Sequence, residues 1–213
     1  MALRSVAFSL PLAIGVAWLL TRRRFPGRTL FDAVVHLPLV LPPVVVGYVL
    51  LVLFGTRGPL GGWLQRSFGI ELVFTRAGAA LATAVMSFPL MVRAIRISLE
   101  HVDRGLEDAA RTLGAGPFDR FLTITLPLIL PGILAGAVTA FSAGLGEFGA
   151  VITFVSNIPG ETRTLPLALY TALQMPDGDA IAARLAVISF SLGVLGLLVA
   201  EGVARFARRR LGG

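Results

Sequence analysis

The sequence predicts an all-α integral membrane protein with about five transmembrane helices. Apolar residues make up 55% of the 213-residue chain, and its mean hydropathy is +0.83. This composition is too apolar for an ordinary soluble domain. Several apolar runs also approach the ~20 residues that a helix needs to cross the hydrocarbon core. We therefore expect one membrane domain over residues 1–213, with spans at about 5–20, 33–54, 77–96, 121–146 and 181–204.

The first apolar run, 5–20, is expected to be a span rather than a signal peptide. It follows Arg4 and ends before the three consecutive arginines at 22–24. A signal peptide carries its positive charge before the apolar run and a small-residue cleavage site after it. Here the strong charge follows the run and no such site is present, so we expect the run to remain in the membrane.

The second span, 33–54, is expected to be irregular because it contains three prolines, among them Pro42 and Pro43. Prolines remove backbone donors, and a helix that faces lipid has nothing else to satisfy the freed carbonyls. We expect a kinked or widened helix inside a bundle, which either lines a passage or is bent only for packing. Asp32 and His36 stand four residues apart near its start and are expected to form an interfacial pair.

The later apolar segments are of unequal length. A glycine-rich stretch at 55–76 predicts a loop, and the third span, 77–96, contains one proline. The fourth span, 121–146, carries glycines at spacings that let helices approach closely. The run at 150–155 is too short to cross a membrane, so it is either the end of the fourth span or a partly buried turn. A short helix at 165–174 precedes the last span.

A polar stretch at 100–131 separates the third and fourth spans and predicts a docking element. Its first part is amphipathic, because charged residues occupy the faces that the apolar stripe leaves free. Gly114 and Gly116 supply the backbone freedom that ends a helix, and Pro117 is suited to open a second short helix over 117–122. The apolar residues that form one helical stripe are Leu99, Val102, Leu106, Ala109, Ala110 and Leu113.

The alternative for this polar stretch is an amphipathic helix that rests on lipid. Five acidic residues in the stretch disfavour contact with an anionic surface. These residues are Glu100, Asp103, Glu107, Asp108 and Asp119. We therefore expect the helix pair to meet a soluble partner.

The arginines predict the orientation of the chain. The segments 21–32 and 93–120 and the tail after residue 201 hold 13 of the 19 arginines. Positive residues accumulate in the cytoplasmic loops of membrane proteins. The pattern favours five spans, an external amino terminus and a cytoplasmic carboxyl terminus. The same topology accounts for the net charge of +7, and the sequence contains no nucleic-acid motif.

The composition also excludes several kinds of chemistry. The chain has no cysteine, and all of its basic residues other than the two histidines are arginine. It therefore lacks a thiolate nucleophile, a Walker A lysine and a Schiff-base lysine. No cluster of histidines and carboxylates suggests an enzyme or a metal site, so we expect no catalytic residue and no metal ligand.

Within the polar stretch, the sequence resembles the EAA loop of ABC importer permeases, E-A-A-x3-G-x9-I-x-L-P. The matching residues are Asp108-Ala109-Ala110, Gly114 and Ile124-x-Leu126-Pro127. An aspartate stands where the family has glutamate, with Glu107 immediately before it. The charge is retained, although the side chain is one methylene shorter.

Four longer segments are similar to the permease subunits of molybdate ABC transporters, and the similarity extends from about residue 8 to residue 205. They are HLPLVLPPVVVGYVLLVLFG (36–55), SFPLMVRAIR (87–96), EDAARTLGAG (107–116) and GEFGAVITFVSNIPGETRTLPLALY (146–170). The resemblance implies a type I ABC importer permease fold with a cytoplasmic coupling helix pair within 97–120. It also implies a multi-pass protein of the bacterial inner membrane.

The resemblance implies an assembly of two copies of this chain, two cytoplasmic ATPase subunits and a periplasmic oxyanion-binding protein. ATP and Mg²⁺ would be bound by the partner, so this chain is expected to hold no cofactor. The residues implied in coupling to the ATPase are Leu106, Glu107, Asp108, Ala109, Ala110, Arg111, Leu113 and Gly114. Candidates for the anion pathway or its gate are Pro42, Pro43, Thr139, Ser142 and Glu147.

Three functions are compatible with the sequence. Import of molybdate or tungstate comes first, and sulfate or thiosulfate import is the alternative within the same class, because sulfate permeases share the EAA loop. The alternative of another class is an ATP-independent channel or secondary transporter. Such a protein needs ionisable residues in the membrane or an inverted repeat, whereas the chain shows ionisable residues only near span ends. Glu147 is expected to make a structural hydrogen bond or a gate contact, or simply to mark a helix end.

Overall fold

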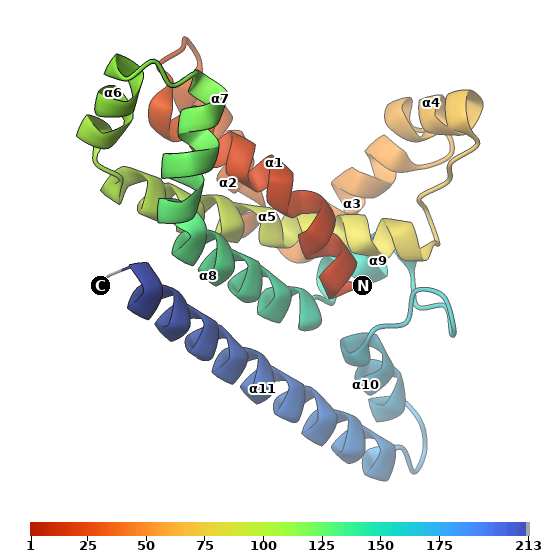
Figure 1. Ribbon diagram of the computed structural model, residues 1–213. Helices are drawn as coiled ribbons and strands as arrows, with labels where there is room; N and C mark the ends of the chain where they lie inside the picture. Colours follow the sequence, from red (N-terminus) through yellow and green to blue (C-terminus); the bar gives the residue numbers. More distant parts are fainter. Residues whose placement is uncertain (212–213) are drawn as a thin grey trace.

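The computed structural model describes residues 1–211, and these residues form helices joined by turns, without a β-strand (Figure 1). The expectation of an all-α protein is confirmed. The helices are α1 (Ala2–Arg22), α2 (Arg28–Val40), α3 (Pro43–Phe54), α4 (Pro59–Phe68), α5 (Arg76–His101), α6 (Arg104–Thr112), α7 (Pro117–Arg120), η1 (Phe121–Thr125), α8 (Leu126–Leu145), α9 (Gly149–Val155), α10 (Leu165–Leu173) and α11 (Asp179–Leu211).

Four helical segments of the described chain are long and apolar enough to cross a membrane. They are α1, α5, the continuous segment Pro117–Leu145 and residues Asp179–Val199 of α11. The bent pair α2 and α3 makes a fifth if the two helices count as one span. The structure therefore agrees with the expected number of about five.

Helix α5 lies at the centre of the bundle and packs against α1 on one side and α8 on the other (Figure 1). Small residues allow this close approach, since a Cβ on Gly136 of α8 would lie 3.2 Å from the Cβ of Ala94 and 3.2 Å from the Cα of Met91. Leu20, Ile95 and Ile129, one from each helix, belong to the resulting core and are fully buried. This three-helix core holds the ends of the polar stretch in place.

The second span is broken rather than kinked. Helices α2 and α3 meet at an angle of 118°, which is far more than the bend expected from the sequence. The residue before a proline favours an extended backbone, and Leu41 has φ −76° and ψ 145°. Pro43 then opens α3 at its first turn, where a missing N–H costs nothing. Two adjacent prolines therefore end one helix and begin another.

The run at 150–155 is neither the end of the fourth span nor a turn. It forms the separate short helix α9, which is buried against α3 and α5. A Cβ on Gly47 of α3 would lie 2.7 Å from the carbonyl oxygen of Ala150. Glycine at position 47 thus allows the backbones of α3 and α9 to touch.

The stretch at 55–76, expected as a loop, contains the helix α4. Pro59 occupies its first turn, and Gly69 ends it with φ +65°. Trp63 and Phe68 stack edge to face with ring centroids 5.5 Å apart. The expectation of a loop over the whole stretch was therefore wrong, because it weighed the number of glycines above the proline that starts the helix and the glycine that ends it.

The second helix of the polar stretch does not end at Leu122. Helix α7 passes through the π-helical turn η1 directly into α8. Pro127 has no N–H, and its ring crowds the carbonyl four residues earlier. The backbone widens just before it, so that the N–H of Leu126 bonds to the carbonyl of Phe121. One continuous helical segment results.

The last helix, α11, lies along α8 and leaves much of its apolar surface exposed (Figure 1). It contacts α8 where small residues meet, since a Cβ on Gly196 would lie 3.4 Å from Ser142 Oγ. The short helix α10 packs against its beginning. Exposed leucine and valine side chains on a long helix are typical of a lipid-facing surface.

Candidate functional site

The polar stretch contains the short helices α6 and α7 at one end of the bundle, and α7 is continuous with η1 and α8 (Figure 1). The expected continuous stripe from Leu99 to Leu113 is wrong, because the helix breaks between α5 and α6. Asp103 caps the new helix, and its Oδ1 accepts a hydrogen bond of 2.8 Å from the N–H of Gly105. The spacing of apolar residues in the sequence is therefore regular from Leu99 to Leu113, although the helix ends at His101 and a new one starts after Asp103.

Because of this break, the apolar residues before it lie in the bundle core and those after it lie on the surface. Leu99 and Val102 are buried in the core of the bundle, whereas Leu106 is 48% exposed and Leu113 is 88% exposed. Helix α6 contributes no residue to that core, and none of its side chains is fully buried. Its apolar side chains are therefore available to another protein.

The end of α6 is a Schellman motif. Gly114 has φ +87°, in the left-handed region that favours glycine. The N–H of Ala115 bonds to the carbonyl of Ala110 at 3.0 Å, and the N–H of Gly114 bonds to that of Arg111 at 3.1 Å. This turn separates α6 from α7 and fixes the angle at which α6 projects.

The charged residues of α6 divide into two groups. Asp108 and Arg111 pair at 3.6 Å, and both side chains are about two-thirds exposed. Glu107 faces its own chain instead. Its Oε1 accepts hydrogen bonds from Arg22 Nη2 at 3.0 Å and from Thr125 Oγ1 at 2.8 Å. We call Arg22, Glu107 and Thr125 the Glu107 cluster.

The Glu107 cluster joins the end of α1, the helix α6 and the π-helical turn η1. The Arg22 side chain is only 9% exposed and that of Glu107 is 24% exposed, and Thr125 is buried. A charge-assisted hydrogen bond in this setting is stronger than one in water. Sequence reasoning missed Arg22 and Thr125, because they lie 85 and 18 residues from Glu107 and no local pattern connects them.

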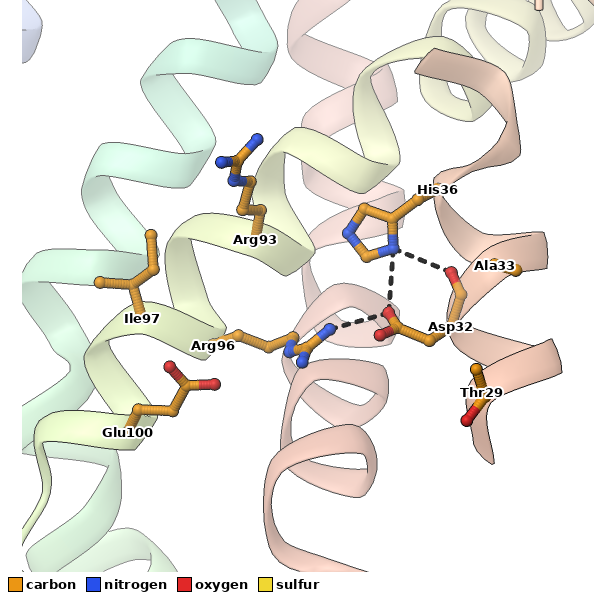
Figure 2. A pocket seen from close by; sticks show the side chains of 8 residues that line it. All are labelled: Thr29, Asp32, Ala33, His36, Arg93, Arg96, Ile97 and Glu100. Atoms are coloured by element: carbon orange, nitrogen blue, oxygen red, sulfur yellow. Dashed lines mark hydrogen bonds and ion pairs between the residues drawn. The ribbon is translucent and has the colours of Figure 1, made fainter. Parts of the chain in front are cut away.

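A second polar cluster joins α2 to α5 beside a cavity of about 530 Å³ (Figure 2). The expected pair of Asp32 and His36 forms at 3.0 Å, and His36 Nδ1 also lies 2.9 Å from the carbonyl oxygen of Asp32. Arg96 of α5 donates to Asp32 Oδ1 at 2.8 Å, a partner that the sequence did not indicate. The cluster thereby ties α2, the helix before the break, to the central helix.

The structure brings together only part of the expected pathway residues. Pro43 adjoins α9, since a Cβ on Gly149 would lie 2.8 Å from Pro43 Cβ. Glu147 makes a structural hydrogen bond at the start of α9, where its Oε1 accepts from the N–H of Ala150 at 2.9 Å. Pro43 and Glu147 therefore both lie beside the start of α9.

Thr139 and Ser142 lie elsewhere. Thr139 is exposed, and its hydroxyl donates to the carbonyl of Ala135 in its own helix at 2.8 Å. Ser142 adjoins Gly196 of α11. Thr83 and Ser87 of α5, which the sequence did not single out, share a cavity of about 170 Å³ with Glu147.

Fold and site together define a multi-pass helical membrane protein with a short exposed helix, α6, that contributes no residue to the bundle core. A family model described as the binding-protein-dependent transport system inner membrane component matches residues 9–210. The chain belongs to this family of inner-membrane transport proteins.

Named relatives are similar over nearly the whole chain. The molybdenum transport system permease protein ModB of Escherichia coli K12 is 62% identical over 98% of this chain and 91% of its own. The protein of the same name from Haemophilus influenzae is 53% identical over 99% and 92%. The sulfate transport system permease protein CysT of Escherichia coli K12 is 40% identical over 92% and 71%.

Among solved structures, a chain of the MetNI methionine ABC transporter in an inward-facing conformation is similar in fold. The TM-score is 0.74 at 17% identity, covering 97% of this chain and 91% of that chain. A bacterial alginate ABC importer gives a TM-score of 0.69 at 17% identity, covering 96% and 74%. These likenesses confirm the expected ABC importer permease fold.

Proposed function

We propose that this chain is the permease subunit of an ATP-driven importer for an oxyanion, with molybdate as the first substrate and tungstate next. The names of the relatives at 62% and 53% identity support molybdenum. The structural observation that carries the proposal is the exposed helix α6, because Leu106 within it and Leu113 directly after it are left outside the bundle core.

The coupling role follows from how α6 is connected. Helix α5 leads into it after two residues, and the continuous segment α7–η1–α8 follows it. Leu106, Ala110 and Leu113 would fill a groove on an ATPase subunit, while Asp108 and Arg111 would fix the register. A rigid-body motion of the ATPase would then move two spans at once.

Glu107 has a different part in this proposal. It was expected to contact the ATPase, but its carboxylate bonds to Arg22 and Thr125 of its own chain. We propose that it transmits the motion of α6 to α1. The residues proposed to contact the ATPase are then Leu106, Ala109, Ala110 and Leu113, together with the exposed pair Asp108 and Arg111.

The proposed assembly contains two copies of this chain, two ATPase subunits and a periplasmic binding protein. ATP and Mg²⁺ bind to the ATPase, so this chain is non-catalytic. The arginine distribution supports a cytoplasmic helix pair, a cytoplasmic carboxyl terminus and a periplasmic amino terminus. Because the binding protein captures the anion, the permease needs only weak contacts along a hydrated passage.

The passage itself is proposed near α9. Pro42 and Pro43 lie where α3 begins, and Glu147 directly precedes α9 and lines the cavity of about 170 Å³. Thr139 is exposed on the single chain, so it would line a passage only between two copies. Ser142 faces α11 and is the weakest of the five candidates.

The experiment is ATP hydrolysis by the chain co-purified with its ATPase in liposomes, with binding protein loaded with molybdate or with sulfate. Molybdate-loaded protein should stimulate hydrolysis, and Leu113→Asp should abolish the stimulation because it places a charge in the proposed groove. Ile70→Asp, the same kind of change at an exposed position after α4, should not.

Stimulation by sulfate-loaded protein alone would favour sulfate, the alternative suggested by the relative at 40% identity. Failure of the ATPase to co-purify would contradict the proposal. Anion movement without ATP would replace it with the channel or secondary transporter.

A further inference from the structure

A cavity of about 590 Å³ lies between the end of α1 and the helix pair, on the side of α6 that carries the Glu107 cluster. Its walls come from α1, α6, α7 and η1. The residues that give the cavity its chemical character are Gly15, Trp18, Arg23, Arg120 and Phe121.

Two arginines in this cavity have no carboxylate partner among the described residues. Arg23 lies over the ring of Trp18, with its Cζ 5.3 Å from the ring centroid. Arg120 donates only to the backbone carbonyls of Glu107 and Gly116, each at 3.4 Å. Glu107 also lines the cavity, but Arg22 compensates its charge at 3.0 Å. The cavity therefore carries an uncompensated positive charge.

The lining changes from apolar to charged along α1. Gly15 and Arg23 are eight residues apart, which corresponds to roughly 12 Å along a helix. Along α1, Gly15 and Trp18 precede Arg23 in the lining, and on the facing side Arg120 is followed by Phe121 and Thr125 of η1. Tryptophan is enriched where hydrocarbon meets the headgroups, so the cavity extends from the hydrocarbon edge to the headgroup level.

We propose that this cavity binds an anionic phospholipid. The lipid phosphate would lie between Arg23 and Arg120, and the first part of an acyl chain would lie against Gly15 and Phe121. Basic pockets between membrane helices bind such headgroups. A free anion would satisfy the arginines but would leave the apolar end of the cavity without a ligand. Such a lipid would hold the end of α1 against α7, beside the proposed ATPase contact.

The test is native mass spectrometry of the delipidated full chain in detergent, titrated with phosphatidylglycerol or with phosphatidylcholine. One phosphatidylglycerol should bind in preference to phosphatidylcholine. At about 1 kcal/mol for each arginine near a headgroup, the double variant Arg23→Gln/Arg120→Gln should lose about thirtyfold in affinity. Arg24→Gln is the matched control, because Arg24 is an exposed neighbour outside the cavity, and it should keep the preference.

A second variant separates a lipid from a free anion. A Cβ on Gly15 would have no heavy atom within 4 Å, so Gly15→Leu should fill the apolar end without disturbing the fold. It should prevent lipid binding while both arginines remain. Inorganic phosphate at millimolar concentration should not displace the lipid from the native chain.

Two results would overturn the proposal. One is wild-type binding by the double arginine variant, and the other is displacement by inorganic phosphate together with unchanged binding by Gly15→Leu. Lipid binding is measured without transport, so a chain that binds no lipid would leave the proposed importer function unaffected. Equally, a chain that fails the ATP hydrolysis test could still bind the lipid.

Discussion

Replacing Glu107 by alanine should destabilise the protein far more than replacing its neighbour Asp108. Glu107→Ala removes the carboxylate that accepts hydrogen bonds from Arg22 and Thr125. Arg22 remains largely buried, because its side chain is only 9% exposed. The variant therefore leaves a guanidinium that water reaches poorly and that has lost its counter-charge.

The cost follows from the burial of the two partners. Removing one member of a fully buried ion pair costs about 3–5 kcal/mol. Glu107 is 24% exposed, so water compensates in part, and we expect about 3 kcal/mol. By contrast, Asp108 and Arg111 are an exposed pair at 3.6 Å, and such pairs contribute about 0–1 kcal/mol.

The assay is thermal unfolding of the purified chain in detergent. At roughly 2–4 °C per kcal/mol for a chain of this size, Glu107→Ala should lower Tm by at least about 6 °C, and Asp108→Ala should lower it by no more than about 4 °C. Arg22→Leu combined with Glu107→Leu should recover much of the loss, because no buried charge remains unpaired. Equal Tm values for Glu107→Ala and Asp108→Ala would refute the reasoning.

Three further changes test the packing and the turns, each followed by thermal unfolding. Gly132→Ala should destabilise the protein by about 1–3 kcal/mol through overpacking, since the new Cβ would lie 2.5 Å from the Cβ of Ser98. The control is Gly193→Ala, which should stabilise the protein slightly because no heavy atom lies within 4 Å of the new Cβ. Ser156→Gly should raise stability by about 1 kcal/mol, because Ser156 has φ +62° and ψ −167°, and no gain would mean that the loop is unstrained. Gly114→Ala should lower stability by about 1–2 kcal/mol at its φ of +87°, and an unchanged Tm would show that the turn is not needed.

Local patterns predicted the parts of this fold that depend on local chemistry. The number of apolar runs gave about five spans, and the glycine followed by a proline after Leu113 predicted a helix end and a new helix start. The structure shows both, with Gly114 in the left-handed region. Each of these signals lies within a few residues of the feature that it specifies.

Long-range pairing was not available from the sequence. The apolar spacing runs unbroken from Leu99 to Leu113, so it did not show that Leu99 enters the bundle core while Leu113 stays exposed. Arg22 lies 85 residues from Glu107, and Arg96 lies 64 residues from Asp32. Charge alone does not identify which of 19 arginines reaches which carboxylate, because tertiary packing decides it.

The continuous segment from α7 through η1 to α8 is long enough to turn a small tilt at the helix pair into a larger displacement at its far end. It contains 29 residues, which corresponds to a rod of roughly 43 Å. A tilt of about 5° imposed at α7 would displace the opposite end by roughly 4 Å over that length, provided that α8 moves as a unit. A small displacement at the membrane surface would thereby become an opening near Gly146, where α8 ends and the turn to α9 begins.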